Sequence, residues 1–199
     1  MRLVLVGPIG RDIRLLSRAL WVAMHQLHAD RIVYLGSDHA IDAVVDVWAH
    51  LWSAETALHT KAATVINTDA ASIRTELQHE QLRTRLKCIQ SLAGHGVCSI
   101  ELLLDRVVVM IDDKALFDEE DILPASILAF GYGDALLRKV GSRMFVAPGV
   151  LNHKEQGLAL LQEDATQGIL ISLHALDGKE TLRDCYEVNR VGRARFNIY

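Results

Sequence analysis

Cysteine is scarce in this sequence, and its three copies show no shared pattern. Cys88, Cys98 and Cys185 are odd in number and lack the close spacing of a metal site. We therefore expect no disulfide framework and predict reduced, buried thiols, as in a cytosolic protein.

Long hydrophobic runs and a surplus of positive charge are also missing. No apolar run approaches the roughly 20 residues needed to cross a bilayer as a helix. Residues 1–6 are apolar, but they lead into a turn and a helix rather than into a cleavage site. The formal net charge is −4, whereas binding to nucleic-acid phosphates needs a basic face. We therefore expect a cytoplasmic protein without membrane insertion and without a nucleic-acid partner.

What is present is the composition of an ordinary globular domain. Half of the 199 residues are apolar and 23% are charged. A chain of this size and composition builds a sufficient core without disulfide or metal support. We therefore predict a single domain over residues 1–199.

The first half of the chain repeats strand, short loop and helix. Short apolar runs predict buried strands, and apolar stripes at helical spacing predict the helices between them. The expected strands are residues 2–6, 31–35 and 62–66, and the expected helices are one capped by Asp12, one over 40–53 and one over 71–92. This alternation predicts a parallel sheet with right-handed crossovers.

The second half is rich in hairpins. A tight turn at Asp105 joins the expected strands 97–104 and 106–111, and an Asp-Gly pair joins 168–175 to 181–189. The remaining expected elements are strands over 126–130, 143–147 and 193–198 and a short helix over 118–123. We predict an α/β fold, a four-layer α-β-β-α sandwich of two mixed sheets packed face to face.

The loops after the expected strands carry the functional signal, because ligands of α/β sheets bind beyond the carboxyl ends of the strands. In chain order these loops contain GPIG, GSD, INTD, MIDD, GYGD and APGV, and ADRIVYLGS and PASILAFG overlap two of them. This layout resembles the calcineurin-like metallophosphoesterases, in particular their small single-domain phosphodiesterases, over nearly the whole chain. In that family the same loops contain D-x-H, G-D, G-N-H/C-D, H-G, G-H-T-H and N-P-G-S.

The resemblance implies a two-metal hydrolase whose ligands are mostly lost here. Two neighbouring divalent ions need a bridging carboxylate and several imidazoles. Pro8 and Gly10 stand where the family has the Asp and His of its first loop, and neither has a ligating side chain. The other matched positions are Ser37 for Asp, Asn67 retained, Thr68 for the general acid, Ile111 or Asp112 for His, and Tyr132 and Asp134 for two His. We therefore predict no dinuclear metal site.

Three functions remain open. The leading hypothesis is a catalytically inactive phosphoesterase-like protein, a pseudoenzyme that binds a protein partner or itself. An alternative is a phosphodiesterase or phosphatase with a rearranged Mg²⁺ or Mn²⁺ site made of loop oxygens. Its candidate ligands are Asp38, Asn67, Asp112 and Asp134, although turn residues and helix caps explain these positions as well. A third hypothesis is a regulator that binds a nucleotide in the same crevice.

Large aromatic residues of the first two helices are the candidate contacts with a partner. Trp48 and Trp52 lie four residues apart on one helix face, and Trp21 lies on the preceding helix. Exposed, these side chains mark an interface, whereas buried ones belong to the core. The histidines are expected at the surface, and residues 94–96 (GHG) are interpreted as a turn between a helix and a strand.

Overall fold

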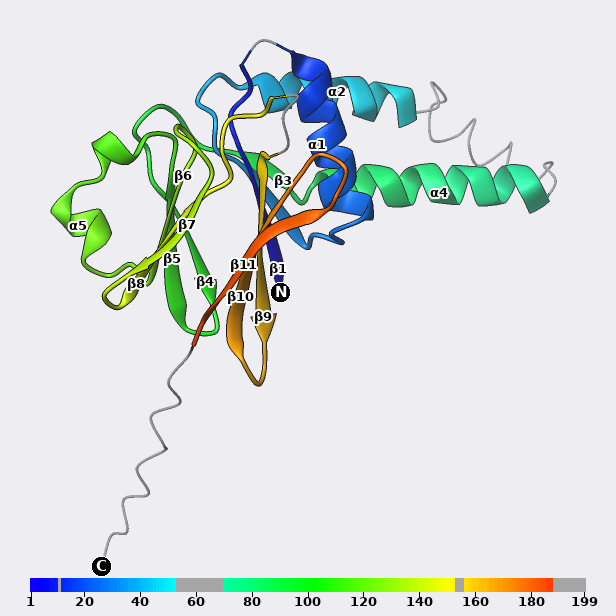
Figure 1. Cartoon of the computed structure of the whole chain (residues 1–199). Helices are drawn as coiled ribbons and strands as arrows, with labels where there is room; N and C mark the ends of the chain where they lie inside the picture. Colours follow the sequence, from blue (N-terminus) through cyan, green and yellow to red (C-terminus); the bar gives the residue numbers. More distant parts are fainter. Residues whose placement is uncertain (11, 53–69, 153–155, 188–199) are drawn as a thin grey trace, which may run out of the picture.

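The computed structural model describes residues 1–10, 12–52, 70–152 and 156–187, which form two mixed β-sheets with flanking helices (Figure 1). The first sheet has six strands in the order β11-β10-β9-β1-β2-β3. They are β1 (Arg2–Val6), β2 (Arg31–Tyr34), β3 (Ile89–Ser91), β9 (Leu158–Asp164), β10 (Gly168–His174) and β11 (Glu180–Tyr186). Strands β1, β2 and β3 are parallel, and β9, β10 and β11 continue the sheet in antiparallel fashion.

The second sheet has five strands in the order β4-β5-β6-β8-β7. They are β4 (Ser99–Leu103), β5 (Arg106–Ile111), β6 (Ile127–Phe130), β7 (Leu136–Val140) and β8 (Arg143–Ala147). Strands β5, β6 and β8 are parallel, whereas β4 and β7 run antiparallel to their neighbours. The prediction of two mixed sheets with flanking helices is therefore confirmed.

The helices lie on the outer sides of the two sheets. Helices α1 (Ile13–His25), α2 (Ala40–Trp52) and α4 (Ala70–Leu86) accompany the first sheet, and α2 contacts α4. Of the described helices, only the 3-10 helix η1 (Lys114–Leu116) and the short α5 (Glu119–Ile122) accompany the second sheet. Local capping explains two starts: Asp12 accepts from the backbone N–H of Arg14, and Asp118 and Asp121 form a capping box on α5.

The main core lies between the sheets, and β1 contributes to two core regions at once. Because successive side chains of a strand point to opposite faces, Leu3 and Leu5 pack against the second sheet with Met110 and Val146. The alternate residues of β1, Val4 and Val6, pack under the apolar face of α1. This arrangement explains why the four residues of the first strand after Arg2 are all apolar.

The third strand of the first sheet differs from the prediction. The expected strand 62–66 lies outside the described residues, and so does the expected final strand 193–198. The strand beside β2 is β3, so the predicted helix over 71–92 is wrong at its end and stops at Leu86. Leu82, Leu86 and Ile89 fit a helical spacing, which is why the sequence predicts a longer helix. In the structure Ile89 instead belongs to a strand and pairs with Ile32 of β2. Strands β7 and β9 were not predicted.

Candidate functional site at the strand ends

The opening turn after β1 is held by backbone contacts on both sides. The Gly7 N–H donates to the carbonyl of Gly157 at 2.9 Å, and the Leu151 N–H donates to the carbonyl of Pro8 at 2.8 Å. A Cβ atom on Gly7 would lie 1.8 Å from the Gly149 carbonyl oxygen. Residue 7 must therefore be glycine, and the turn after β1 is packed against the loop after β8.

A buried tyrosine links the loops after β1 and β2. The Tyr34 hydroxyl accepts from the Ile9 N–H at 3.1 Å and donates to Asp38 Oδ1 at 2.8 Å. Asp38 Oδ1 also accepts from the Ala40 N–H at 3.2 Å, at the start of α2. Burial raises the pKa of the Tyr34 hydroxyl well above its usual range, so this group stays protonated and able to donate. Asp38, a candidate metal ligand, thus accepts from the first backbone N–H of α2 and from the Tyr34 hydroxyl.

A second junction is built on Asp112, the fully buried carboxylate that follows β5. Asp112 Oδ1 accepts from the Gly96 N–H at 2.9 Å, Oδ2 lies 2.5 Å from His95 Nδ1, and the Ser37 side chain is a further donor. Burial alone raises the pKa of the Asp112 carboxyl, but hydrogen bonds from Gly96, His95 and Ser37 outweigh it and lower the pKa overall. One ionised carboxylate therefore ties together the loops after β2, β3 and β5.

The loop after β6 joins the same junction through the backbone. The carbonyl oxygen of Asp112 accepts from the N–H of Gly131 at 3.0 Å and of Tyr132 at 2.8 Å. A Cβ atom on Gly131 would lie 2.2 Å from the Leu35 carbonyl oxygen, so the strand ends of β2 and β6 are in close contact here. Glycine at this position allows that approach.

His95 is the residue of this junction that sequence reasoning missed. Its Nδ1 faces the buried carboxylate, yet 67% of its side chain is exposed. Because Asp112 is an ionised acceptor, Nδ1 carries a proton, and in the neutral ring Nε2 is the unprotonated nitrogen. The available signal is the Gly-His-Gly sequence of residues 94–96, but the sequence predicts a helix over 71–92 directly before it. Because β3 precedes them, residues 94–96 form a loop at the end of a strand and not the predicted turn between a helix and a strand.

The structure brings together only part of the predicted site. Ser37 and Asp112 are in contact, while Tyr132 and Asp134 are exposed on the loop after β6. Pro8 is buried and Gly10 is exposed on the loop after β1. Asn67 and Thr68 lie outside the described residues.

The described residues do not fit a two-metal centre. Pro8 and Gly10 supply no ligand, and Asp38 Oδ1 and both carboxylate oxygens of Asp112 accept hydrogen bonds from the protein itself. Within the described ranges, no group of three or more His, Cys, Asp or Glu side chains is arranged to hold a metal ion. The carboxylates of Asp38 and Asp112 serve here as hydrogen-bond acceptors that connect the loops.

The three tryptophans lie in different surroundings. Trp21 on α1 is 50% exposed, and its ring centroid lies 5.1 Å from that of His25. Trp48 on α2 is half-buried against the core under the first sheet. The side chain of Trp52 lies outside what the structure describes. Among the described residues, no helix is both long enough and apolar enough to cross a membrane.

Comparison with known proteins found likeness in structure and none in sequence. No family model matches this chain, and no curated protein matches it. A conserved uncharacterized protein from Streptococcus pneumoniae TIGR4, described as a predicted phosphoesterase, is similar over 94% of this chain and 99% of its own, at 9% identity and a TM-score of 0.49. Another solved structure aligns over 88% of this chain and 98% of its own, at 13% identity and a TM-score of 0.43.

A hypothetical protein from Thermus thermophilus is similar over 94% of this chain and 98% of its own, at 7% identity and a TM-score of 0.37. The structural neighbours therefore include a predicted phosphoesterase. At these identities and TM-scores the likeness supports no functional argument, and function has to be argued from the residues of this chain.

Proposed function

We propose that this chain is a phosphoesterase-like protein that acts as a protein-interaction module and performs no metal-dependent hydrolysis at its strand ends. The observation that carries the proposal is the state of Asp112. This buried carboxylate accepts from Gly96, His95 and Ser37, so its oxygens are committed to protein donors. The loops that would hold two cations are instead joined to one another by hydrogen bonds.

An apolar surface on the second sheet supports the interaction role. On the face turned away from the first sheet, Ile100 lies opposite Val109, which is followed by Leu128 and Phe145 across the strands. Of the described helices, only η1 and α5 accompany this face, and beside them remains a groove of about 400 Å³. Its lining includes Phe117, Ile122, Phe130, Leu136, Val140 and Phe145. The exposed side chains of this face are Ile100 on β4 and Val140 on β7, whereas Val109, Leu128 and Phe130 are buried. Exposed apolar side chains beside a groove can form part of an interface.

Hydrolysis of bis-p-nitrophenyl phosphate tests the catalytic half of the proposal. The purified full-length protein is assayed with and without Mn²⁺ and Mg²⁺, and its metal content after purification is measured. We expect no turnover above buffer and no stoichiometric metal. Metal-dependent turnover that is lost in Asp134→Ala or Asp112→Asn contradicts the proposal.

Self-association tests the interaction half, since a symmetric dimer is the simplest assembly for an exposed apolar face. Light scattering across a concentration series is expected to show a dimer in the wild type. Val140 is 53% exposed in the groove, so Val140→Glu should return the protein to a monomer without unfolding it. Trp21→Ala tests in the same way whether the exposed face of α1 takes part in self-association. A wild type that stays monomeric at every concentration counts against self-association.

The exposed imidazole of His95 favours a second candidate, a hydrolase with a rearranged site. An imidazole oriented by a buried carboxylate is suited to general acid–base catalysis. If this candidate is correct, phosphodiester turnover falls at least a hundredfold in His95→Gln. The same phosphodiester turnover in the wild type and in His95→Gln rejects this candidate.

A further inference from the structure

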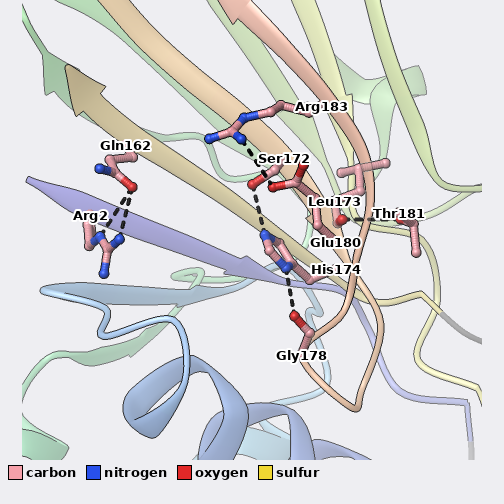
Figure 2. A network of polar contacts seen from close by, with 9 residues as sticks. All are labelled: Arg2, Gln162, Ser172, Leu173, His174, Gly178, Glu180, Thr181 and Arg183. Atoms are coloured by element: carbon pink, nitrogen blue, oxygen red, sulfur yellow. Dashed lines mark hydrogen bonds and ion pairs between the residues drawn. The ribbon is translucent and has the colours of Figure 1, made fainter.

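A second cluster of polar side chains lies away from the strand-end loops, on the helix-facing side of the antiparallel half of the first sheet (Figure 2). Register places its members side by side: Ser172 on β10 is directly opposite Arg183 on β11, and Gln162 on β9 is opposite Arg2 on β1. A cavity of about 200 Å³ opens over this face, beside the end of α1. Its lining includes Arg2, Leu160, Gln162, Ser172, His174 and Arg183.

Two of these residues form a buried hydrogen-bonded pair. Ser172 Oγ lies 2.8 Å from His174 Nε2, and His174 Nδ1 lies 3.1 Å from the carbonyl oxygen of Gly178. A carbonyl accepts only, so Nδ1 must carry the proton, and the neutral ring presents Nε2 as an acceptor for the serine hydroxyl. Figure 2 shows the order hydroxyl, imidazole, carbonyl. A hydroxyl, a base and a group that orients the base are the parts of an activated nucleophile.

The local backbone holds His174 in this orientation. The pairing of β10 with β11 shifts register between Leu173 and His174, and such a bulge redirects the side chain beside it. The turn beyond is closed by two hydrogen bonds, from Ala175 N–H to the Lys179 carbonyl and from Gly178 N–H to the Ala175 carbonyl, each 2.9 Å long. A Cβ atom on Gly178 would lie 1.8 Å from the Gln26 side chain, and its φ of +87° suits glycine. The turn that carries the accepting Gly178 carbonyl thus lies against the Gln26 side chain, just beyond the end of α1.

The cations of the cluster differ in availability. The guanidinium of Arg2 donates to Gln162 Oε1 at 3.3 and 3.1 Å and to the Leu27 carbonyl at 3.1 Å, so it is anchored. Arg183, 57% exposed, has a longer contact of 3.8 Å with Glu180. Its position across from Ser172 makes it the group able to meet a negatively charged ligand that enters the cavity.

We propose that Ser172 is a nucleophile activated by His174, in a site for small carboxylic esters that bear an anionic group. Ser172 Oγ bonds to the ester carbonyl carbon while its proton passes to His174 Nε2. The carbon–oxygen bond to the alcohol then breaks, and the alcohol leaves with that proton. Water, deprotonated by His174, cleaves the acyl-serine, which releases the carboxylic acid and restores both groups. Arg183 holds the anionic substituent.

This site is separate from Asp112 and needs no metal, so its failure and the failure of the proposed interaction role are distinguishable. The first experiment treats the full-length protein with a fluorophosphonate probe, which phosphonylates activated serines with loss of fluoride. We expect one adduct, located on Ser172 by peptide mass mapping. Ser172→Ala abolishes the adduct, and His174→Gln, which keeps a polar side chain but supplies no base, slows labelling at least a hundredfold. Ser17→Ala, at a half-buried serine on α1, is the matched control and labels like the wild type.

The second experiment uses ester substrates to test the role of Arg183. Hydrolysis of the p-nitrophenyl monoester of a dicarboxylic acid is compared with that of p-nitrophenyl acetate. In Arg183→Leu, KM for the anionic ester should rise about tenfold, while the values for the acetate change little. Far-UV circular dichroism verifies that each variant is folded.

Three results overturn the proposal: a wild type that takes up no probe, an adduct on another residue, or labelling that His174→Gln leaves unchanged. Should Ser172→Ala fail to fold, the mapped adduct on the wild type and the rate in His174→Gln still decide the question. A purely structural role for the pair predicts loss of stability in these variants with no adduct on the wild type.

Discussion

His95 Nδ1 and Asp112 Oδ2 lie 2.5 Å apart, although the imidazole is largely exposed and the carboxylate is fully buried. The pair joins the loop after β3 to the end of β5, and therefore one sheet to the other. Its carboxylate partner also receives the N–H of Gly96 and the Ser37 side chain. A single ionised group thus joins the two sheets at the strand ends, in addition to the backbone contacts of Gly7 and Gly131.

Replacing Asp112 with asparagine should destabilise the protein. The new side chain would present an amide N–H₂ toward at least one donor, and a buried donor without an acceptor costs about 1–3 kcal/mol, more where a charged group is involved. We expect the free energy of unfolding to fall by about 2 kcal/mol or more in urea titrations. Asp134→Asn, at an exposed position, is the control and should change it by less than about 0.5 kcal/mol. Equal effects in the two variants contradict this role of Asp112.

The same carboxylate makes stability depend on acidity. Its pKa is lowered on folding, so the unfolded chain binds the proton at a higher pH than the folded chain does. The contribution of Asp112 is therefore complete above the unfolded value of about 4 and is lost as the pH falls through the folded pKa. We expect the difference in unfolding free energy between wild type and Asp112→Asn to shrink below about pH 4. A difference that stays constant from about pH 7 to about pH 3 contradicts this assignment.

The Tyr34 hydroxyl should contribute measurably to the junction of the first two loops. Tyr34→Phe leaves the ring in the core but removes the acceptor of Ile9 and the donor to Asp38. Loss of these bonds should lower the unfolding free energy by about 1–2 kcal/mol. Tyr132→Phe, at a residue that is 39% exposed, should change it by less than about 0.5 kcal/mol. Hydrogen exchange of the Ile9 amide should also accelerate in Tyr34→Phe alone.

Elements with strong local signals were predictable, and the short edge strand was not. Strand β5 and strand β8 have the predicted bounds, because each is an apolar run with a clear turn before or after it. Strand β3 has only Ile89, Gln90 and Ser91, and these residues are half-buried or exposed. This strand forms because it pairs with β2 at the edge of the sheet, and three residues are too few to show an alternating pattern in the sequence.

The error at β3 carried over to the candidate site. With residues 71–92 assigned to one helix, His95 fell in a connection and not at a strand end. Its bond to Asp112 spans 17 residues of sequence, and no local pattern indicates such a contact. Ser172 and His174, in contrast, are two residues apart on a predicted strand, but a pair of polar residues on one strand face is common. Only the bulge and the Gly178 carbonyl make that pair distinctive.

The opening turn offers a pair of glycines with opposite expected behaviour. A Cβ on Gly7 would lie 1.8 Å from the backbone carbonyl of Gly149, and backbone cannot move aside as a flexible side chain does. Gly7→Ala should therefore lower the unfolding free energy by about 3 kcal/mol or more, or prevent folding. A Cβ on Gly10 meets nothing within 4 Å, so Gly10→Ala should be neutral or slightly stabilising. Thermal unfolding of both variants measures the contrast. Equal tolerance at both positions means that the loops after β1 and β8 do not pack together in solution.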